Sequence, residues 1–432
     1  MYNKKEETHP ITWRIKKDGD PVFITEYIKK NGYNSLKKVL KRFSFTDVLE
    51  IVIKSGLKGR GGAGFPTGIK WKFVASSKKE KRYLICNADE MEPGTYKDRF
   101  IMERIPHLLI EGMIISAYAI RASVGYIFLR GEYKNSEKIL KKAIYEAEEK
   151  KLLGKNILNS DFDFSIFIHT GAGRYICGEE TALINSLEGN RPNPRAKPPF
   201  PVEFGLWGNP TCVNNVETFC NIPYILLYGE NWYKNLSFSK DSGTKLIGFS
   251  GNVNNPGLWE VPLGTPAVEI LKNYAKGMKK GFFLKAWQPG GAGTSFLTKK
   301  HIEVPMDFDS LQNLGSRLGT GIAIVIDHTI NMVSVTKNLE KFFSRESCGF
   351  CTPCRDGLPW TVKILDRLEK KQGKKKDIEL LEEICHFLSP GSTFCAHAQG
   401  AASPLQSAIK YFREEFEMGI KKDKIITKFY NI

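Results

Sequence analysis

Hydrophobic and polar positions show two different periods in the first half of the sequence. Short apolar runs at residues 82–86, 125–130 and 163–169 predict strands, and longer segments at 99–120 and 136–151 predict helices between them. Strands that alternate with helices in this way pair in parallel, because a parallel connection must cross over the sheet. The pattern therefore predicts an α/β fold with a doubly wound, Rossmann-like sheet, in which ligands bind beyond the carboxyl ends of the strands.

The pattern changes after residue 240. The predicted elements are then a hairpin, a helix and two further strands, at residues 245–261, 265–275, 282–287 and 322–326. This order of elements is typical of a β-grasp, or ubiquitin-like, domain. Beyond that the periodicity is wholly helical, with helices predicted at residues 331–344, 357–369, 377–387 and 404–415.

We therefore expect three domains in the chain. They are an α/β domain with an N-terminal arm at residues 1–240, a β-grasp domain at 241–330 and a C-terminal helical bundle at 331–432. A chain of 432 residues is too long for one compact core, and about two to four domains are usual at this length.

The composition is that of a globular protein. Nine cysteines are too few for a disulfide scaffold, and three of them crowd into one segment, which favours metal ligation in a reducing compartment. The apolar run at residues 108–129 is interrupted by Glu111 and Arg121, so no membrane-spanning segment is predicted. The N-terminus resembles neither a signal peptide nor a transit sequence. We expect a soluble protein of the cytoplasm.

The net charge is +17, but the basic residues are scattered. Short runs at residues 78–81 and 370–376 contain no aromatic residues on which bases would stack, so nucleic-acid binding is the least favoured explanation. A solvated surface, lysine enrichment for heat stability and an acidic protein partner each explain the excess.

Three cysteines stand two residues apart, at Cys348, Cys351 and Cys354. One tight loop can aim all three sulfurs at a single point, which suits the corner of a cuboidal iron–sulfur cluster. Such a cluster needs a fourth thiolate, and both Cys385 and Cys395 are candidates. Zinc is the main alternative, but structural zinc sites more often pair two Cys-x-x-Cys or Cys/His units. Three small buried residues would be a weaker explanation of the pattern.

Residues 56–71 are the most glycine-rich stretch of the chain. The Gly-x-Gly-x-x-Gly spacing that starts at Gly59 matches the dinucleotide fingerprint, but that fingerprint follows a strand, and here a helix precedes it. The stretch instead predicts a loop whose bare backbone lies against a flat or phosphorylated ligand, with Arg60 and Lys70 supplying positive charge. A flexible linker is the alternative, but the aromatic residues of the stretch are unusual in linkers.

Polar segments follow the first and third predicted strands, at residues 87–92 and 171–180. Because the carboxyl ends of parallel strands meet at one edge, both segments are expected at a single nucleotide site. Helix capping explains one acid there, but not four. Acids that can accept hydrogen bonds from ribityl or ribose hydroxyls and from ring N–H groups are Asp89, Glu90, Glu179 and Glu180.

Five segments, in this order along the chain, resemble the 51 kDa flavoprotein subunit of complex I, which is the NADH-oxidising component of NADH:quinone oxidoreductase. They are residues 59–71, 87–99, 171–183, 211–218 and 347–357. The resemblance spans nearly the whole chain. It implies a noncovalently bound FMN under the glycine loop, with NADH stacked on the flavin in a solvent-accessible cavity. It also implies hydride transfer from C4 of NADH to N5 of FMN, then one-electron transfer to a [4Fe-4S] cluster and onward to quinone through partner subunits.

The resemblance also implies which residues bind FMN. They come from the glycine loop and from the ends of strands, at Gly59, Arg60, Gly61, Gly62, Ala63, Lys70, Asn87, Asp89, Glu90, Gly178, Glu179, Val213, Asn214, Asn215 and Thr218.

For NADH, the resemblance implies that the adenine lies between Phe65 and Phe73, where ring stacking contributes about 1 kcal/mol beyond buried area. Glu90 and Glu180 are the implied catalytic residues, which orient the nicotinamide and hold water or a proton. Carboxylates at this site would repel a 2′-phosphate, so NADH is expected over NADPH. The NADH site is completed by Glu92, Tyr175, Glu180, Lys197 and Phe200.

One residue departs from the family pattern. Met91 stands where the family usually has Gly or Ser, between two acids of the cavity. A long thioether there would crowd the flavin or nicotinamide, or stiffen a peptide unit that a small residue lets rotate. We expect an effect on turnover and on NADH affinity.

The implied cluster ligands are Cys348, Cys351, Cys354 and Cys395, which leaves Cys385 as an ordinary thiol. The implied partners are a small thioredoxin-like [2Fe-2S] subunit and a larger iron–sulfur subunit of complex I. They would hold the protein peripherally on the cytoplasmic side of a bacterial inner membrane.

Other functions remain open at the level of sequence. Similar chains serve as diaphorase subunits of NAD-linked hydrogenases and formate dehydrogenases, but those often carry extra N-terminal ferredoxin-like segments, and the short start here favours complex I. Two non-enzymatic alternatives are an electron-carrying interaction module and a basic nucleic-acid-binding protein with a structural zinc.

Overall fold

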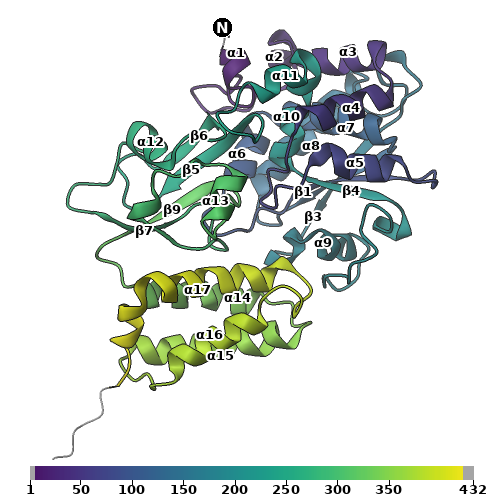
Figure 1. The fold of residues 1–432 in the computed structure, drawn as a ribbon. Helices are drawn as coiled ribbons and strands as arrows, with labels where there is room; N and C mark the ends of the chain where they lie inside the picture. Colours follow the sequence, from purple (N-terminus) through teal and green to yellow (C-terminus); the bar gives the residue numbers. More distant parts are fainter. Residues whose placement is uncertain (1–4, 422–432) are drawn as a thin grey trace, which may run out of the picture. The chain divides into compact units, whose positions relative to one another are not determined.

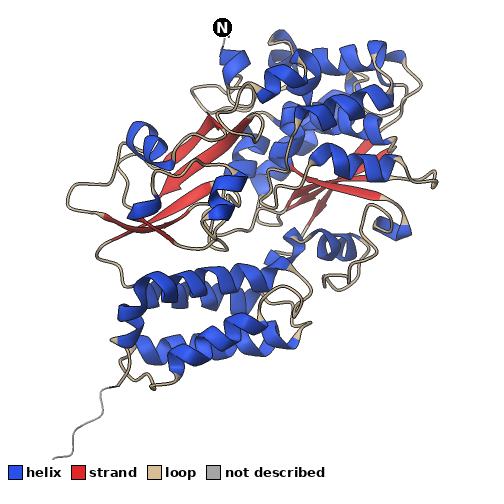
Figure 2. Ribbon diagram, in the orientation of Figure 1, coloured by secondary structure: helices blue, strands red, loops and turns tan. Residues whose placement is uncertain are grey.

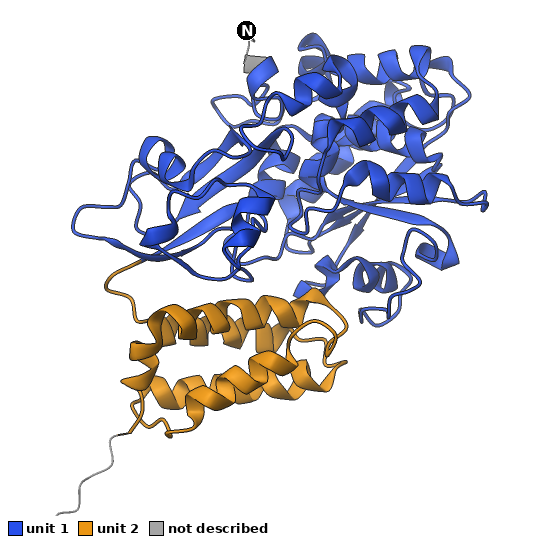
Figure 3. Cartoon of the chain, viewed as in Figure 1, with its two compact units in different colours: residues 1–326 blue, residues 327–432 orange. Residues whose placement is uncertain are grey.

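The computed structural model describes residues 5–421. The chain divides into two compact units, residues 1–326 and 327–432. Figure 3 colours the two units, and Figures 1 and 2 show their helices and strands. The predicted boundary at residue 240 falls inside the first unit, so the division into three domains stays a prediction. No helix in the described part of the chain is long and apolar enough to cross a membrane.

A four-stranded parallel sheet lies in the first unit. Its strands are β1 (Tyr83–Ala88), β2 (Val124–Leu129), β3 (Ser165–Thr170) and β4 (Thr211–Asn215), in the order β3-β2-β1-β4. The expected Rossmann-like parallel sheet is confirmed, together with its first three strands. The sequence does not predict β4, because this strand is short and ends in two asparagines, which are typical of turns.

Helices gather against one face of this sheet (Figure 1). They are α5 (Thr67–Ala75), α7 (Pro106–Ile120), α8 (Lys134–Glu149) and α10 (Val216–Tyr228). Because α7 is apolar on nearly all sides, it lies at the centre of the main core. Its one buried acid, Glu111, accepts hydrogen bonds from the Tyr27 hydroxyl at 2.6 Å and the Tyr33 amide at 3.0 Å.

The N-terminal segment therefore belongs to this core. Its helices are α1 (Lys5–Thr8), α2 (Ile24–Lys29) and α3 (Asn34–Arg42). Tyr27, Tyr33 and Leu36 are fully buried. The sequence predicts a polar arm here, because these three short helices contain few apolar residues, most of which are buried.

Shorter elements connect the sheet to its loops. The helices are α4 (Phe45–Ser55), α6 (Lys97–Arg104), α9 (Glu180–Leu187) and α11 (Glu230–Lys234). The 3₁₀ turns are η1 (Ile157–Asn159), η2 (Tyr175–Gly178) and η3 (Leu206–Gly208). α4 begins at a capping box between Ser44 and Asp47 and ends at Gly56, whose φ of 68° is in the left-handed region that glycine tolerates.

A second, five-stranded sheet completes the first unit. Its strands are β5 (Thr244–Ser250), β6 (Gly257–Pro262), β7 (Leu284–Gln288), β8 (Leu297–Thr298) and β9 (Ile322–Asp327), in the order β6-β5-β9-β7-β8. The predicted hairpin is confirmed as the antiparallel pair of β5 and β6. The helical elements are α12 (Ala267–Glu269), a π-helical turn η4 (Ile270–Tyr274), η5 (Lys299–His301) and α13 (Phe308–Asn313). The name β-grasp stays a prediction.

The second unit is helical, as expected. Its helices are α14 (Met332–Glu346), α15 (Thr352–Glu369), α16 (Asp377–Phe387) and α17 (Ala396–Glu417). The predicted starts of α15 and α17 were too late, at residues 357 and 404. Pro353 occupies the first turn of α15, where proline is favourable, and Pro404 lies inside α17. Cys354 therefore lies in the first turn of α15 and not in the predicted loop.

Candidate functional site

The glycine loop joins the end of α4 to the start of α5. Its base is closed by a bridge between Lys58 and Pro66 and by the Gly59 amide, which donates to the Phe65 carbonyl at 2.9 Å. Gly62 and Gly64 have φ of 135° and 67°, which side chains disfavour. A helix precedes the loop, so the loop is not the turn of a dinucleotide fingerprint.

This loop lies against the start of α10. The Arg60 amide donates to Thr218 Oγ1 at 2.9 Å, and a Cβ atom on Gly61 would come within 3.1 Å of Asn215 Cβ. A Cβ on Gly62 would make an ordinary contact with Gly319 at 3.7 Å. The loop thus presents bare backbone beside the carboxyl end of β4.

The Arg60 side chain points away from the open side of the loop. It is fully buried, and its Nη2 donates to the Tyr233 hydroxyl at 2.9 Å and to the Ser242 carbonyl at 2.7 Å. Only the backbone of Arg60 is therefore available on the ligand side of the loop. Lys70 differs, since its Nζ donates to Glu180 Oε2 and to the Val213 carbonyl, both at 3.2 Å.

Asp89 lies at the carboxyl end of β1 with an unused hydrogen-bond acceptor. Its Oδ2 is buried and has no partner among the described residues. Burial raises the pKa of Asp89 to about 7, against the opposing effect of Arg130. Beside it, Asn87 Nδ2 donates to the Gly178 carbonyl at 2.9 Å, which ties β1 to η2. A Cβ on Gly178 would meet only the Asp89 carbonyl, at 3.7 Å.

Glu90 is placed differently from Asp89. Its carboxylate accepts from the amides of Asp98 and Arg99, at 2.7 and 3.0 Å, and from the Tyr133 hydroxyl at 3.0 Å. It therefore caps the start of α6. Burial, followed by the charge of Asp98, raises the pKa of Glu90 to about 7. The catalytic role of Glu90 stays a prediction, as does that of Glu180.

Glu92 links the segment that follows β1 to the loop between β7 and β8 of the second sheet. Its two oxygens accept from the Tyr175 hydroxyl and from the Gly293 amide, each at 2.6 Å. Burial raises the pKa of Glu92 in spite of these bonds. Met91, the residue that departs from the family pattern, is half-buried and stands between Glu90 and Glu92 in the sequence.

Two lysines converge on the acids at the start of α9. Lys197 Nζ lies 3.0 Å from Glu179 Oε1 and 3.1 Å from Glu180 Oε1. Glu179 also caps α9 through the Ala182 amide at 2.9 Å. Burial pushes the pKa of Glu180 upward, but Lys70 and Lys197 outweigh it, so that the pKa is lowered. Glu180 is therefore held as a carboxylate.

Three phenylalanines predicted to line the NADH site are exposed. Phe65, Phe73 and Phe200 are 48%, 53% and 49% accessible, so each presents a ring to solvent. The predicted asparagines of β4 are less available to a ligand, because their side chains already make hydrogen bonds within the protein. Asn214 Oδ1 accepts from Trp71 Nε1 at 2.9 Å, and Asn215 caps α10 through the Glu217 amide.

A buried ionic network beneath the site has no counterpart among the predicted residues. Glu217 accepts from Lys97 Nζ at 2.9 Å and from Lys245 Nζ at 3.1 Å, and all three are fully buried. Lys97 also pairs with Asp98 at 2.7 Å, and Lys245 donates to the Arg60 carbonyl at 3.3 Å. No sequence signal distinguishes these charges from surface charges.

In the second unit, four cysteines come together. Cys351 precedes α15 as its N-cap residue, Cys354 lies in its first turn, and Cys395 is the N-cap residue of α17. The pKa of Cys354 is raised to about 12, mainly by burial and then by the neighbouring thiolates of Cys351, Cys395 and Cys348, while the Ser347 hydroxyl lowers it. The Ser347 hydroxyl lies 3.2 Å from Cys354 Sγ.

Cys385 lies apart from this group. Its pKa is raised by burial and by two acids, Glu340 and Glu382, and not by another thiol. Among the described residues, no three His, Cys, Asp or Glu side chains surround a single metal ion.

Two family models and several relatives match the parts of the chain that contain these residues. The Nuo51 FMN-binding domain model matches residues 52–224, and the iron–sulfur binding region of NADH-ubiquinone oxidoreductase-F matches residues 334–419. The NADH-quinone oxidoreductase F subunit of Buchnera aphidicola subsp. Schizaphis graminum is 66% identical over 97% of this chain and 94% of its own length. The corresponding Escherichia coli K12 protein is 64% identical over 96% and 94%.

The chain belongs to the NADH-quinone oxidoreductase F-subunit family. The expected resemblance is thereby confirmed. A solved NAD⁺-reducing [NiFe]-hydrogenase in the H₂-reduced state contains a similar chain, with 35% identity and a TM-score of 0.80 over 88% of this chain. The match covers 63% of that hydrogenase chain, so the likeness is to part of a longer protein.

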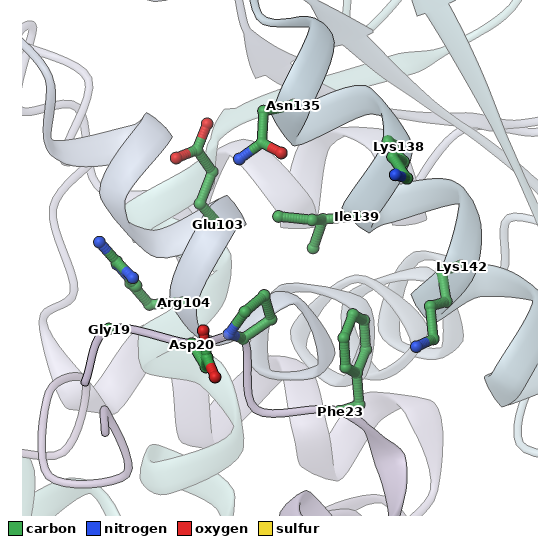
Figure 4. Close-up of a pocket in the computed structure, with 10 residues that line it drawn as sticks. Gly19, Asp20, Phe23, Glu103, Arg104, Asn135, Lys138, Ile139 and Lys142 are labelled. Atoms are coloured by element: carbon green, nitrogen blue, oxygen red, sulfur yellow. The ribbon is translucent and has the colours of Figure 1, made fainter. Parts of the chain in front are cut away.

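The two family matches enclose the two sites. The first contains every residue from the glycine loop to Thr218, and the second contains all four grouped cysteines. A separate surface cavity of about 480 Å³ lies outside both sites (Figure 4). It is lined by residues of the N-terminal segment, α6 and α8, including Phe23, Arg104 and Lys142, and by none of the predicted site residues.

Proposed function

We propose that the chain is the NADH dehydrogenase subunit of complex I, a flavin-dependent NADH:quinone oxidoreductase that binds FMN, NADH and a [4Fe-4S] cluster. The observation that carries this proposal is the unpartnered, buried Asp89 carboxylate beside a bare glycine loop at the carboxyl end of a parallel sheet, within the FMN-binding match. A polar ligand that fills this space would satisfy Asp89.

The residues present fit FMN. Gly59, Gly61, Gly62 and Gly178 present backbone without side chains, and Asp89 and Asn87 offer polar atoms to hydroxyls and ring N–H groups. Lys70 can supply positive charge at this site, whereas the Arg60 side chain is turned into the core. Bound FMN would supply a hydride acceptor for NADH and a donor of single electrons.

The acids and lysines at α9 position the substrate. Lys70 and Lys197 hold Glu180 as a carboxylate, so it can accept a hydrogen bond from the nicotinamide amide. Orientation of this kind is the main contribution of the protein, because the cofactor supplies the chemistry. Glu92 and Tyr175 form a fixed pair that suits a ribose hydroxyl and repels a 2′-phosphate.

We further propose that Cys348, Cys351, Cys354 and Cys395 hold the cluster. Support comes from their mutual effect on the pKa of Cys354 and from the separation of Cys385. The proposed partners are a small thioredoxin-like [2Fe-2S] subunit and a larger iron–sulfur subunit. Through them the protein would sit peripherally at the cytoplasmic face of a bacterial inner membrane. A hydrogenase diaphorase role is less favoured, since that likeness has 35% identity against 66% for the Buchnera relative.

The direct test is an anaerobic titration of the purified chain with NADH. We expect the flavin absorbance to bleach with NADH and to remain with NADPH. Oxidised flavin that persists at saturating NADH would contradict the proposal. Yellow colour, iron content and NADH:ferricyanide activity, measured on the same sample, distinguish a missing cofactor from an inactive one.

Removal of Asp89 is expected to weaken FMN retention. Asp89→Ala deletes the buried hydrogen-bond acceptor. A ligand N–H or O–H group left without this acceptor costs about 1–3 kcal/mol of binding free energy, which is roughly a 5- to 150-fold loss of affinity. Flavin fluorescence released on dilution measures the affinity. Glu132→Ala, an exposed acid near Arg130, is the matched control and should retain FMN.

Removal of an adenine-stacking ring is expected to weaken NADH binding alone. Phe65→Ala or Phe73→Ala should raise KM for NADH by about 2- to 10-fold with little change in kcat, because stacking acts equally in the ground and transition states. Steady-state NADH:ferricyanide kinetics measure both constants. Phe238→Ala removes another exposed ring and should leave KM unchanged.

A further inference from the structure

The face of the parallel sheet opposite its helices carries a group of aromatic rings. Side chains alternate along each strand, and Leu84, Cys86 and Ile127 point into the core under the helices. The register pairs Ile85 with Tyr126 and Tyr126 with Phe167 on the other face. Parallel sheets are usually covered on both faces, so exposed rings on this face require an explanation.

The rings form a continuous row of four residues, Tyr83, Tyr126, Phe167 and Trp207, which we call the aromatic row. Centroid distances are 5.8 Å from Phe167 to Tyr126, 6.0 Å from Tyr126 to Trp207, and 5.2 Å from Trp207 to Tyr83. Phe167 is 52% exposed and Trp207 is 50% exposed. Tyr83 is buried and Tyr126 is half-buried, so they support the row from within, and its exposed part is formed by Phe167 and Trp207. Large apolar rings exposed in one patch mark an interaction site.

Trp207 is held outward by a strained backbone. Its φ of 47° and ψ of 40° lie in the left-handed region, which is uncommon for a bulky residue. Glu188 fixes this conformation, because its Oε1 accepts from the Trp207 amide at 2.8 Å while its other oxygen pairs with Arg195. Strain that surrounding contacts maintain is typical of functional positions.

Positive charge flanks the aromatic row. Lys81 Nζ lies 5.6 Å from the centroid of Tyr83, and Lys79 Nζ lies 5.4 Å from that of Phe204, which is itself exposed. A second copy of the chain would bring the same lysines and another net charge of +17 to the contact. Charge therefore favours an acidic partner over self-association.

We propose that the aromatic row is the docking surface for another protein subunit of the enzyme, apolar where it meets Phe167 and Trp207 and acidic where it meets Lys79 and Lys81. The register links the row to the proposed flavin site through Ile85, a fully buried residue that pairs with Tyr126 and lies two residues from Asn87 on the same face of β1. That the partner belongs to the same assembly rests on the proposed function. The docking surface itself rests on the rings and lysines.

Hydroxyl-radical footprinting of the isolated full-length protein and of the assembled NADH dehydrogenase module tests the proposal. We expect Phe167 and Trp207 to be oxidised readily in the isolated protein and at least about tenfold more slowly in the module. Equal reactivity in both states would overturn the proposal, as would rings that are already protected in the isolated protein at a concentration where it is monomeric.

Variants separate docking from catalysis. Phe167→Ser and Lys79→Glu/Lys81→Glu should each weaken assembly with the partner subunits at least about tenfold, while NADH still bleaches the flavin. Lys37→Glu/Lys41→Glu makes the same charge change on exposed positions of α3 and should assemble normally. Normal assembly of the first two variants would show the surface to be wrong. Loss of flavin bleaching in the wild-type protein would instead reject the proposed function and leave the docking result to stand on its own.

Discussion

Cys395→Ala is expected to abolish the four-iron cluster while NADH still reduces the flavin. The substitution removes one of the thiols that act on Cys354, and no other cysteine in the described part of the chain is placed to replace it. The flavin site lies within residues 59–218, so it does not depend on this ligand for its construction. Iron and acid-labile sulfide per chain, measured beside anaerobic flavin bleaching, report the two sites separately.

Cys385→Ala is the matched control for this variant. Cys385 is fully buried in α16, so its loss should reduce stability modestly and leave the iron content unchanged. If Cys385→Ala loses the cluster and Cys395→Ala retains it, the ligand assignment is wrong. Loss of flavin bleaching in Cys395→Ala would show that the two sites are not separable.

The choice between these two cysteines shows how far the sequence reaches. Spacing identifies three clustered thiols but leaves the fourth open, and only the family resemblance favours Cys395. The fold adds a physical reason, because α17 begins immediately after Cys395, whereas Cys385 points from α16 into the core. A position on a helix face depends on tertiary packing, which spacing along the chain does not contain.

The same limit applies to the flavin site. Strand and helix periods predict the parallel sheet and the edge at which Asn87 and Asp89 follow β1. They do not predict which side chains turn away from that edge. The sequence predicts Arg60 to be a ligand cation, yet its guanidinium donates to Tyr233, and Glu90 caps α6. Lysine and glutamate are taken for surface residues unless their burial is known, so composition does not predict the network around Glu217.

Glu217→Gln is expected to be the most destabilising single change in the first unit. It would leave Lys97 and Lys245 buried without the carboxylate that pairs with both, at a cost of about 3–5 kcal/mol of unfolding free energy. The network also holds the Arg60 carbonyl through Lys245, so FMN should bind less tightly. Denaturant unfolding monitored by circular dichroism measures the loss.

Acid sensitivity provides an independent test of the same network. Burial opposes ionisation of Glu217, but Lys245, Lys97 and Arg60 outweigh it and lower its pKa from 4.5 to about 2. Because the folded-state pKa is the lower one, the stabilisation is complete above about pH 4.5 and is lost as the pH falls towards 2. The stability difference between the wild-type protein and Glu217→Gln should therefore shrink across this window.

A surface ion pair supplies the control for Glu217. Glu137 pairs with Lys141 at 2.7 Å on the exposed side of α8, and Glu137→Gln should change the unfolding free energy by less than about 1 kcal/mol. Similar small losses from both variants would mean that the buried charges are hydrated or neutral in solution. A large loss from Glu217→Gln alone, fading in acid, would establish that an ionised network beneath the glycine loop holds the flavin-binding fold together.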